Sequence, residues 1–157
     1  MGGKQRHRKR LHDIIRFTNP AKRWDVKMKG KKLILVVDDN EDLIYSVKEG
    51  LMSMSKDYDV IGVQSGRKCL ELLKSKTPEL ILLDIMMPGM DGWDVCAKVK
   101  ANKKTEKIPI VFLTAKTDQI SKSMGRLASE DYIEKPFDMK DLKKRIDAII
   151  LAHEIKK

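Results

Sequence analysis

The stretch Leu80–Gly92, Leu-Ile-Leu-Leu-Asp-Ile-Met-Met-Pro-Gly-Met-Asp-Gly, decides how the rest of the chain is interpreted. Its first four residues, Leu80–Leu83, are apolar, which is typical of a strand buried on both faces of a parallel sheet. Asp84 ends this run, and a carboxylate there is costly to desolvate unless a partner or a reaction uses it. A Pro-Gly pair then predicts a loop, and Asp91 suits the N-cap of a following helix. We therefore expect a strand-loop-helix unit that holds one acidic side chain at the carboxyl end of the strand.

Charge is distributed very unevenly along the 157 residues. Residues 1–32 contain 12 Lys or Arg and two Asp, whereas the remainder contains 21 basic and 21 acidic residues. The whole net charge of +10 therefore belongs to the first 32 residues. This change of composition predicts a basic N-terminal tail over 1–32 and one domain over 33–155, which is long enough to bury a substantial core.

The composition and the cysteines argue against a membrane-spanning or secreted protein. No apolar stretch approaches the roughly 20 residues of a membrane span, and the basic N-terminus lacks the apolar segment of a secretory signal. Cys69 and Cys96 fall on predicted helices without metal-type spacing, so we interpret them as reduced thiols. These features predict a cytoplasmic protein without a membrane span.

From Leu33 onward, short apolar runs alternate with segments of helical periodicity. Strands are predicted at 33–37, 59–63, 80–84, 109–113 and 132–133. Apolar residues at helical spacing follow each strand: Ile44, Val47, Leu51 and Met54; Leu70 and Leu73 within 65–75; Val95 and Val99; Ile120, Met124 and Leu127; Leu142, Ile146, Ile149 and Ile150. Five strands alternating with five helices predict an α/β fold, with an all-parallel sheet covered by helices on both faces.

Polar side chains gather at the carboxyl ends of these predicted strands. They are Asp38 and Asp39 after the first strand, Asp84 after the third, Thr114 after the fourth and Lys135 after the fifth. Each has an ordinary structural explanation by itself, such as a helix cap or a turn. Because ligands of open parallel sheets bind outside this edge, their coincidence favours a functional site.

The chemistry of this set favours phosphoryl transfer. Three neighbouring carboxylates repel one another unless a cation lies between them, and oxygen ligands without His or Cys suit Mg²⁺ better than Zn²⁺. A metal, a nucleophilic carboxylate, a hydroxyl and an ammonium together match transfer of a phosphoryl group to a carboxylate. Mg²⁺ and Lys135 would neutralise the charge that develops on the transferred oxygens.

Four motifs resemble the receiver domain of two-component response regulators, of the stand-alone chemotaxis-receiver type. They are Val36-Val37-Asp38-Asp39, the stretch Leu83–Gly92, Leu113-Thr114-Ala115-Lys116, and Asp131-Tyr132-Ile133-Glu134-Lys135-Pro136-Phe137. The motifs occur in the family's order and at close to its spacing, from about Leu33 to about His153. The resemblance implies a flavodoxin-like fold with strand order 2-1-3-4-5.

The resemblance also implies an acceptor and a metal site. Asp84 would accept a phosphoryl group from the phosphohistidine of a histidine kinase or phosphotransfer protein. Mg²⁺ would be bound by Asp39 and Asp84, by Asp38 mainly through water, and by the backbone carbonyl of Met86. The domain would catalyse only its own phosphorylation and dephosphorylation.

A conformational switch is the second implication of the resemblance. Lys135 would hold the phosphoryl group, and Thr114 would donate a hydrogen bond to it. Tyr132 would be the switch aromatic that moves inward with Thr114, and the Lys135–Pro136 peptide bond would be cis. The family commonly has a Gly-containing turn before this segment, whereas here residues 128–131 run into Tyr132 about one residue short and without that Gly. The resemblance therefore does not predict the path of the chain into the fifth strand.

The leading function is a stand-alone phospho-switch or phosphorelay intermediate that acts on a downstream protein. A second interpretation is a nucleic-acid-associated regulator, because a tail of charge +10 could bind an anionic partner. A third is a phosphohydrolase of the haloacid-dehalogenase type. That family carries an Asp-x-Asp motif after its first strand, whereas this chain has adjacent Asp38 and Asp39 there.

Overall fold

Five parallel strands form one sheet in the order β2-β1-β3-β4-β5, which confirms the predicted flavodoxin-like topology. This computed structural model describes residues 30–115 and 130–157. The elements are β1 Lys32–Val37, α3 Glu41–Met54, β2 Tyr58–Val63, α4 Gly66–Leu72, β3 Leu80–Asp84, α5 Gly92–Ala101, β4 Ile110–Thr114, β5 Asp131–Glu134 and α7 Met139–Lys156. The helix predicted around Ile120, Met124 and Leu127, and residues 1–29 of the predicted tail, lie outside the described residues.

Strand β3 is the centre of the sheet, and all five of its residues are buried. It pairs in parallel with β1 on one side, where Leu82 faces Val36, and with β4 on the other, where Leu82 faces Val111. Because helices cover both faces, the strand carries a continuous apolar run instead of alternating polar residues. This explains why Leu80–Leu83 was readable as a strand from the sequence.

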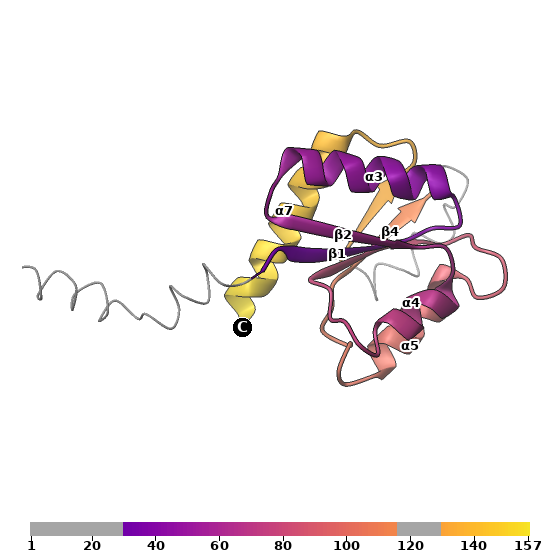
Figure 1. Cartoon of the computed structure of the whole chain (residues 1–157). Coiled ribbons are helices and arrows are strands. Elements are labelled where there is room, and N and C mark those ends of the chain that lie inside the picture. The colour runs from indigo at the N-terminus through magenta and orange to yellow at the C-terminus, as the bar shows by residue number, and fades with distance from the viewer. Residues whose placement is uncertain (1–29, 116–129) are drawn as a thin grey trace, which may run out of the picture. The chain divides into compact units, whose positions relative to one another are not determined.

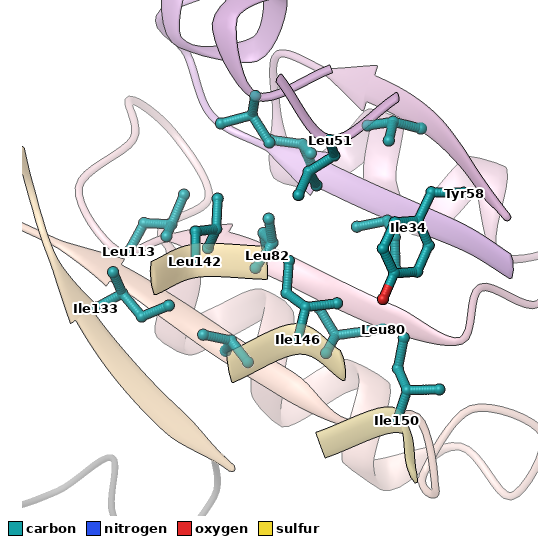
Figure 2. Close-up of a cluster of buried hydrophobic side chains, with 14 residues drawn as sticks. Ile34, Leu51, Tyr58, Leu80, Leu82, Leu113, Ile133, Leu142, Ile146 and Ile150 are labelled. Carbon is teal, nitrogen blue, oxygen red and sulfur yellow. The ribbon is translucent and has the colours of Figure 1, made fainter. Parts of the chain in front are cut away.

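Helices α3 and α7 cover one face of the sheet, and α4 and α5 cover the other (Figure 1). Alternate residues of β3 serve the two layers: Leu80 and Leu82 join the core under α3 and α7, whereas Ile81 and Leu83 join the core under α4 and α5. Figure 2 shows the first of these cores, in which Leu142, Ile146 and Ile150 of α7 meet strand residues. Two packed layers thus hold the carboxyl ends of the strands in fixed positions.

The predicted inward face of α3 is correct except at its end. Val47 and Leu51 are fully buried, and Ile44 is partly buried against the same core. Met54, which the spacing placed on this face, is 39% exposed. It is the last residue of the helix, and its side chain contributes to a shallow hollow beside Lys140 and other residues of α7. The apolar spacing in the sequence therefore extends beyond the part of α3 that is buried in the core.

The helix predicted over 65–75 is shorter than expected. α4 ends at Leu72, and residues 73–75 form turns. Pro78 disfavours helical backbone at Thr77, so the helix could not have continued far. Within the ranges that the structure covers, none of the helices is both long and apolar enough to cross a bilayer.

Candidate functional site

The sheet order brings the predicted site residues to one edge. Asp38 and Asp39 directly follow β1, Asp84 is the last residue of the neighbouring β3, and Thr114 is the last residue of β4. Carboxylate oxygens of the three aspartates lie within 4.8 Å of one another. Asp38 is fully buried and Asp84 is 5% exposed, whereas Asp39 is open to solvent. Three acidic groups therefore meet at the carboxyl ends of two central strands.

Both carboxylate oxygens of Asp38 have partners. The backbone amide of Asn40 donates to Oδ1 over 2.8 Å, and Lys135 Nζ donates to Oδ2 over 2.7 Å. A fully buried carboxylate needs such partners, because it is otherwise very costly to desolvate. Asn40 was not among the predicted site residues. It also caps α3 by accepting from the amides of Asp42 and Leu43, and Asn before a helical period is a signal that could have identified it.

Lys135 bridges the two buried aspartates, because its Nζ also lies 3.3 Å from Oδ1 of Asp84. Burial lowers the pKa of Lys135, but the hydrogen bond and charge of Asp38 outweigh it and leave the pKa raised. Burial raises the pKa of Asp84 to about 6, with a further rise from the charge of Asp38 and an opposing effect of Lys135. One ammonium thus balances only part of the negative charge of three carboxylates.

Thr114 carries an unsatisfied polar atom. The residue is fully buried, and its hydroxyl makes no hydrogen bond with any described residue. Leaving a buried hydroxyl unpaired costs on the order of 1–3 kcal/mol. Its strand β4 lies directly beside β3, where Leu113 faces Asp84 in the register. A hydrogen-bond donor without a partner therefore lies next to the acidic cluster.

Tyr132 is half-buried on β5. Its ring centroid lies 5.5 Å from that of Phe112, which in turn lies 4.8 Å from that of Trp93. Met86 lies in the loop after β3 with 65% of its surface exposed, and the metal-binding role expected of its carbonyl stays a prediction. The peptide bond between Lys135 and Pro136 is cis.

Gly92 allows the first turn of α5 to approach the end of β3. A Cβ atom at this position would lie 2.4 Å from the carbonyl oxygen of Asp84, which is backbone and cannot move aside cheaply. The amide of Gly92 donates to the carbonyl of Ile85 over 2.8 Å. Sequence reasoning missed this positioning role, although Gly directly after the N-cap Asp91 is a visible signal.

The donor set fits a hard divalent cation. All of the clustered acidic ligands are carboxylates, and neither His nor Cys joins this cluster among the described residues. Such oxygen donors suit Mg²⁺, which usually keeps several waters and uses one or two carboxylates together with phosphate oxygens. The exposed Asp39 leaves one side of the cluster open to water and to a ligand.

Comparisons with known proteins agree with this arrangement. Residues 34–147 match the family model of the response regulator receiver domain. The alkaline phosphatase synthesis transcriptional regulatory protein PhoP of Bacillus subtilis (strain 168) is 37% identical over 125 residues, which are 79% of this chain and 50% of that protein. Histidine kinase P4 of Formosa agariphila is 36% identical over 123 residues, 78% of this chain and 9% of the relative. The chain therefore spans half or less of the length of these two curated relatives.

Solved structures show the same similarity. A CheY-like response regulator receiver domain protein from Methanospirillum hungatei JF-1 superposes with a TM-score of 0.70 and 36% identity, covering 78% of this chain and 97% of that one. A response regulator structure from Chloroflexus aurantiacus J-10-fl gives a TM-score of 0.69 and 30% identity, covering 77% and 98%. Nearly all of each of these receiver-like chains is thus matched by part of this one.

Proposed function

Since this chain belongs to the response regulator receiver domain family, we propose that Asp84 accepts the phosphoryl group in two-component signalling. The observation that carries the proposal is a buried carboxylate with a raised pKa, placed 3.3 Å from an ammonium and beside an unpaired hydroxyl. At neutral pH this carboxylate is ionised and therefore nucleophilic. Among the described side chains, Lys135 and Thr114 would donate to the oxygens of an incoming phosphoryl group.

The proposed step is a displacement at phosphorus. An oxygen of Asp84 forms a bond to the phosphorus of a phosphohistidine as the phosphorus–nitrogen bond breaks, and the released imidazole takes a proton from water. Lys135 then shares its ammonium between Asp38 and the new phosphoryl group. The hydroxyl of Thr114 donates to a phosphoryl oxygen and gains the partner that it lacks in this structure.

We assign the cation to Mg²⁺, held by Asp38, Asp39, Asp84 and the backbone carbonyl of Met86. When bound, Mg²⁺ supplies positive charge that neutralises the oxygens of the phosphoryl group. The support is the excess of carboxylates over ammonium groups among the described residues of this edge, together with the solvent-open side at Asp39. Mg²⁺ would thus complete a charge balance that Lys135 achieves only in part.

The proposed output is a conformational switch. When Thr114 bonds to the phosphoryl group, the end of β4 shifts, and Tyr132 on the neighbouring β5 repacks. The ring of Tyr132 already contacts Phe112 on β4, so a shift of the end of β4 would displace Tyr132 on β5. We propose a stand-alone switch or phosphorelay intermediate, with a histidine kinase or phosphotransfer protein before it and a downstream protein after it.

The basic segment 1–32 could bind an additional anionic partner. Its charge of +10 favours a nucleic-acid-associated regulator as the second candidate function. A gel-shift titration with salt would support this if binding weakens steeply, and salt-independent binding would contradict it.

We also propose a cytoplasmic location, because Cys69 and Cys96 are both buried free thiols.

The test of the main proposal is reaction of the full chain with acetyl phosphate and Mg²⁺, followed by intact mass spectrometry. We expect one added phosphoryl group, which is absent when Mg²⁺ is chelated and absent in Asp84→Asn. A matched control is Asp91→Asn, which changes a carboxylate that caps α5 outside the acidic cluster and should keep the label. Equal labelling of Asp84→Asn and the wild type would disprove the assignment.

A further inference from the structure

A groove of about 370 Å³ is lined by residues from the ends of α4 and α5 and from the turns that follow them. These two helices cover the face of the sheet away from α3 and α7 (Figure 1). The apolar floor of the groove is made by Leu70, Leu73 and Val99. Its rim carries three lysines, Lys74, Lys98 and Lys104. The groove lies at the carboxyl ends of the two helices and therefore at the opposite edge of the sheet from the acidic cluster.

The rim has an excess of unpaired positive charge. Lys74 pairs with Glu71 over 2.9 Å, but Lys98 and Lys104 are exposed and form no ion pair within the described ranges 30–115 and 130–157. A hollow with an apolar floor and a cationic rim is complementary to a protruding apolar side chain surrounded by carboxylates. A lipid surface would need apolar groups that protrude, and single-stranded nucleic acid would need aromatic rings for stacking, neither of which this groove provides.

The chain itself presents a surface of that kind on α3. Tyr45 is a large side chain that is 66% exposed in the middle of this helix. Glu41, Asp42 and Glu49 lie three or four residues from it, so they share its face, and Lys48 is the only base among these near neighbours. Tyrosine is also among the residues that most often anchor interfaces.

We propose that the groove between α4 and α5 binds helix α3 of a second copy of this chain. The ring of Tyr45 would enter the apolar floor, and the carboxylates of the helix would face Lys98 and Lys104, as in other helix-in-groove interactions. One molecule cannot fill its own groove, because α3 covers the opposite face of the sheet (Figure 1). The contact is therefore head-to-tail and heterologous, and its small area makes it weak and dependent on concentration.

The test is sedimentation velocity of the full chain from micromolar to near-millimolar concentration, at low and at high salt. The wild type should show a sedimentation coefficient that rises with concentration and that loses this rise at high salt. Lys98→Glu with Lys104→Glu, Glu41→Lys with Glu49→Lys, and Tyr45→Ala should each weaken association by about tenfold or more. The control pair Lys140→Glu with Lys144→Glu changes the net charge equally on α7 and should associate like the wild type.

Mixing the two charge-reversed variants gives the sharpest outcome. Each variant alone should stay monomeric, whereas the mixture should associate again, because the reversed groove meets the reversed helix. Equal melting temperatures show that the variants are folded. Lys98→Gln with Lys104→Gln removes the charge without reversing it and should give a smaller loss of association. Self-association that persists in the groove variant, mixing that restores nothing, or a sedimentation coefficient independent of concentration would overturn the proposal. So would loss of association only in the helix variant, since α3 would then meet other cations.

Discussion

Asp84 and Asp147 are two carboxylates whose pKa values are raised by burial, but their surroundings differ in kind. Asp147 on α7 accepts a hydrogen bond from the hydroxyl of Tyr58 and pairs with Lys143 over 2.6 Å, so one carboxylate has two donors. Within the described ranges, Asp84 shares one lysine, Lys135, with Asp38 and has a third carboxylate, that of Asp39, beside it. The first arrangement fastens a helix to the sheet. The second leaves negative charge uncompensated among the described residues, which lowers stability and, under the proposed function, would suit a cation and a phosphoryl group.

Removal of the paired lysine gives the largest expected difference between the two clusters. Lys135→Met leaves the fully buried Asp38 without its ion pair and should cost about 3 kcal/mol of unfolding free energy. It should also slow phosphorylation by acetyl phosphate by about 100-fold, because a donor to the transferred group is lost. The matched change Lys143→Met removes a half-exposed pair and should cost under about 1 kcal/mol without changing the rate. Urea unfolding and the labelling rate check both, and equal effects of the two changes would contradict the comparison.

Neutralising Asp84 should raise the free energy of unfolding, whereas Lys135→Met should lower it. The pKa of Asp84 is about 6 in the folded chain and ordinarily 3.8. Between these pH values the folded state therefore binds more protons than the unfolded state. Wild-type stability without metal should therefore fall as pH rises from about 4 to about 6 and then level off. Asp84→Asn lacks this fall and should be more stable at neutral pH by up to about 3 kcal/mol. Thermal or urea unfolding across this pH range measures it, and a variant less stable than the wild type at neutral pH would be inconsistent with the account.

Mg²⁺ should remove part of the same repulsion. At about ten times its dissociation constant it should stabilise the wild type by about 1.4 kcal/mol, and it should do so far less for Asp39→Ala. Trp93 is the second residue of α5 and contacts Phe112, so its fluorescence should report binding in a Trp24→Phe background. Unchanged Mg²⁺ affinity in Asp39→Ala would remove that residue from the metal site.

The smallest effect is expected at the second cluster. Asp147→Asn keeps an acceptor for the hydroxyl of Tyr58 but loses the charge partner of Lys143. Because burial also raises the pKa of Asp147, removing its charge relieves a desolvation cost that offsets the lost ion pair, so stability should change by less than about 1 kcal/mol. The change should be well below the stabilisation expected of Asp84→Asn, which makes the two variants a matched pair. Urea unfolding at neutral pH measures the change, and a stabilisation by Asp147→Asn as large as that of Asp84→Asn would remove the distinction between the two clusters.

The sheet and its acidic edge could be predicted because local signals were strong. Leu80–Leu83 and the other apolar runs end in polar residues, and parallel topology places those ends together. The contact of Tyr58 with Asp147 spans 89 positions of sequence and depends on how α7 crosses the sheet, so no local pattern indicates it. The exposure of Met54 could not be predicted either, because helical spacing does not tell where the core beneath the helix ends.

The roles of the site residues stay predictions, and the unpaired hydroxyl of Thr114 shows why. Its residue type and its place after the fourth strand were visible in the sequence, but the lack of a partner is a property of packing. The structure therefore adds a physical reason for a role that the motif alone only suggested. In contrast, the groove between α4 and α5 gave no sequence signal, because its lysines are interspersed with polar residues of an ordinary helix end and loop.

The most direct test is to locate the phosphoryl group on the labelled chain. After reaction with acetyl phosphate and Mg²⁺, reduction with borohydride converts an aspartyl phosphate to homoserine, and peptide mass spectrometry identifies the changed position. The account predicts homoserine at position 84 and unchanged aspartate at 38 and 39. Homoserine at either of those two positions, or a phosphoryl group found on a histidine in place of Asp84, would contradict it.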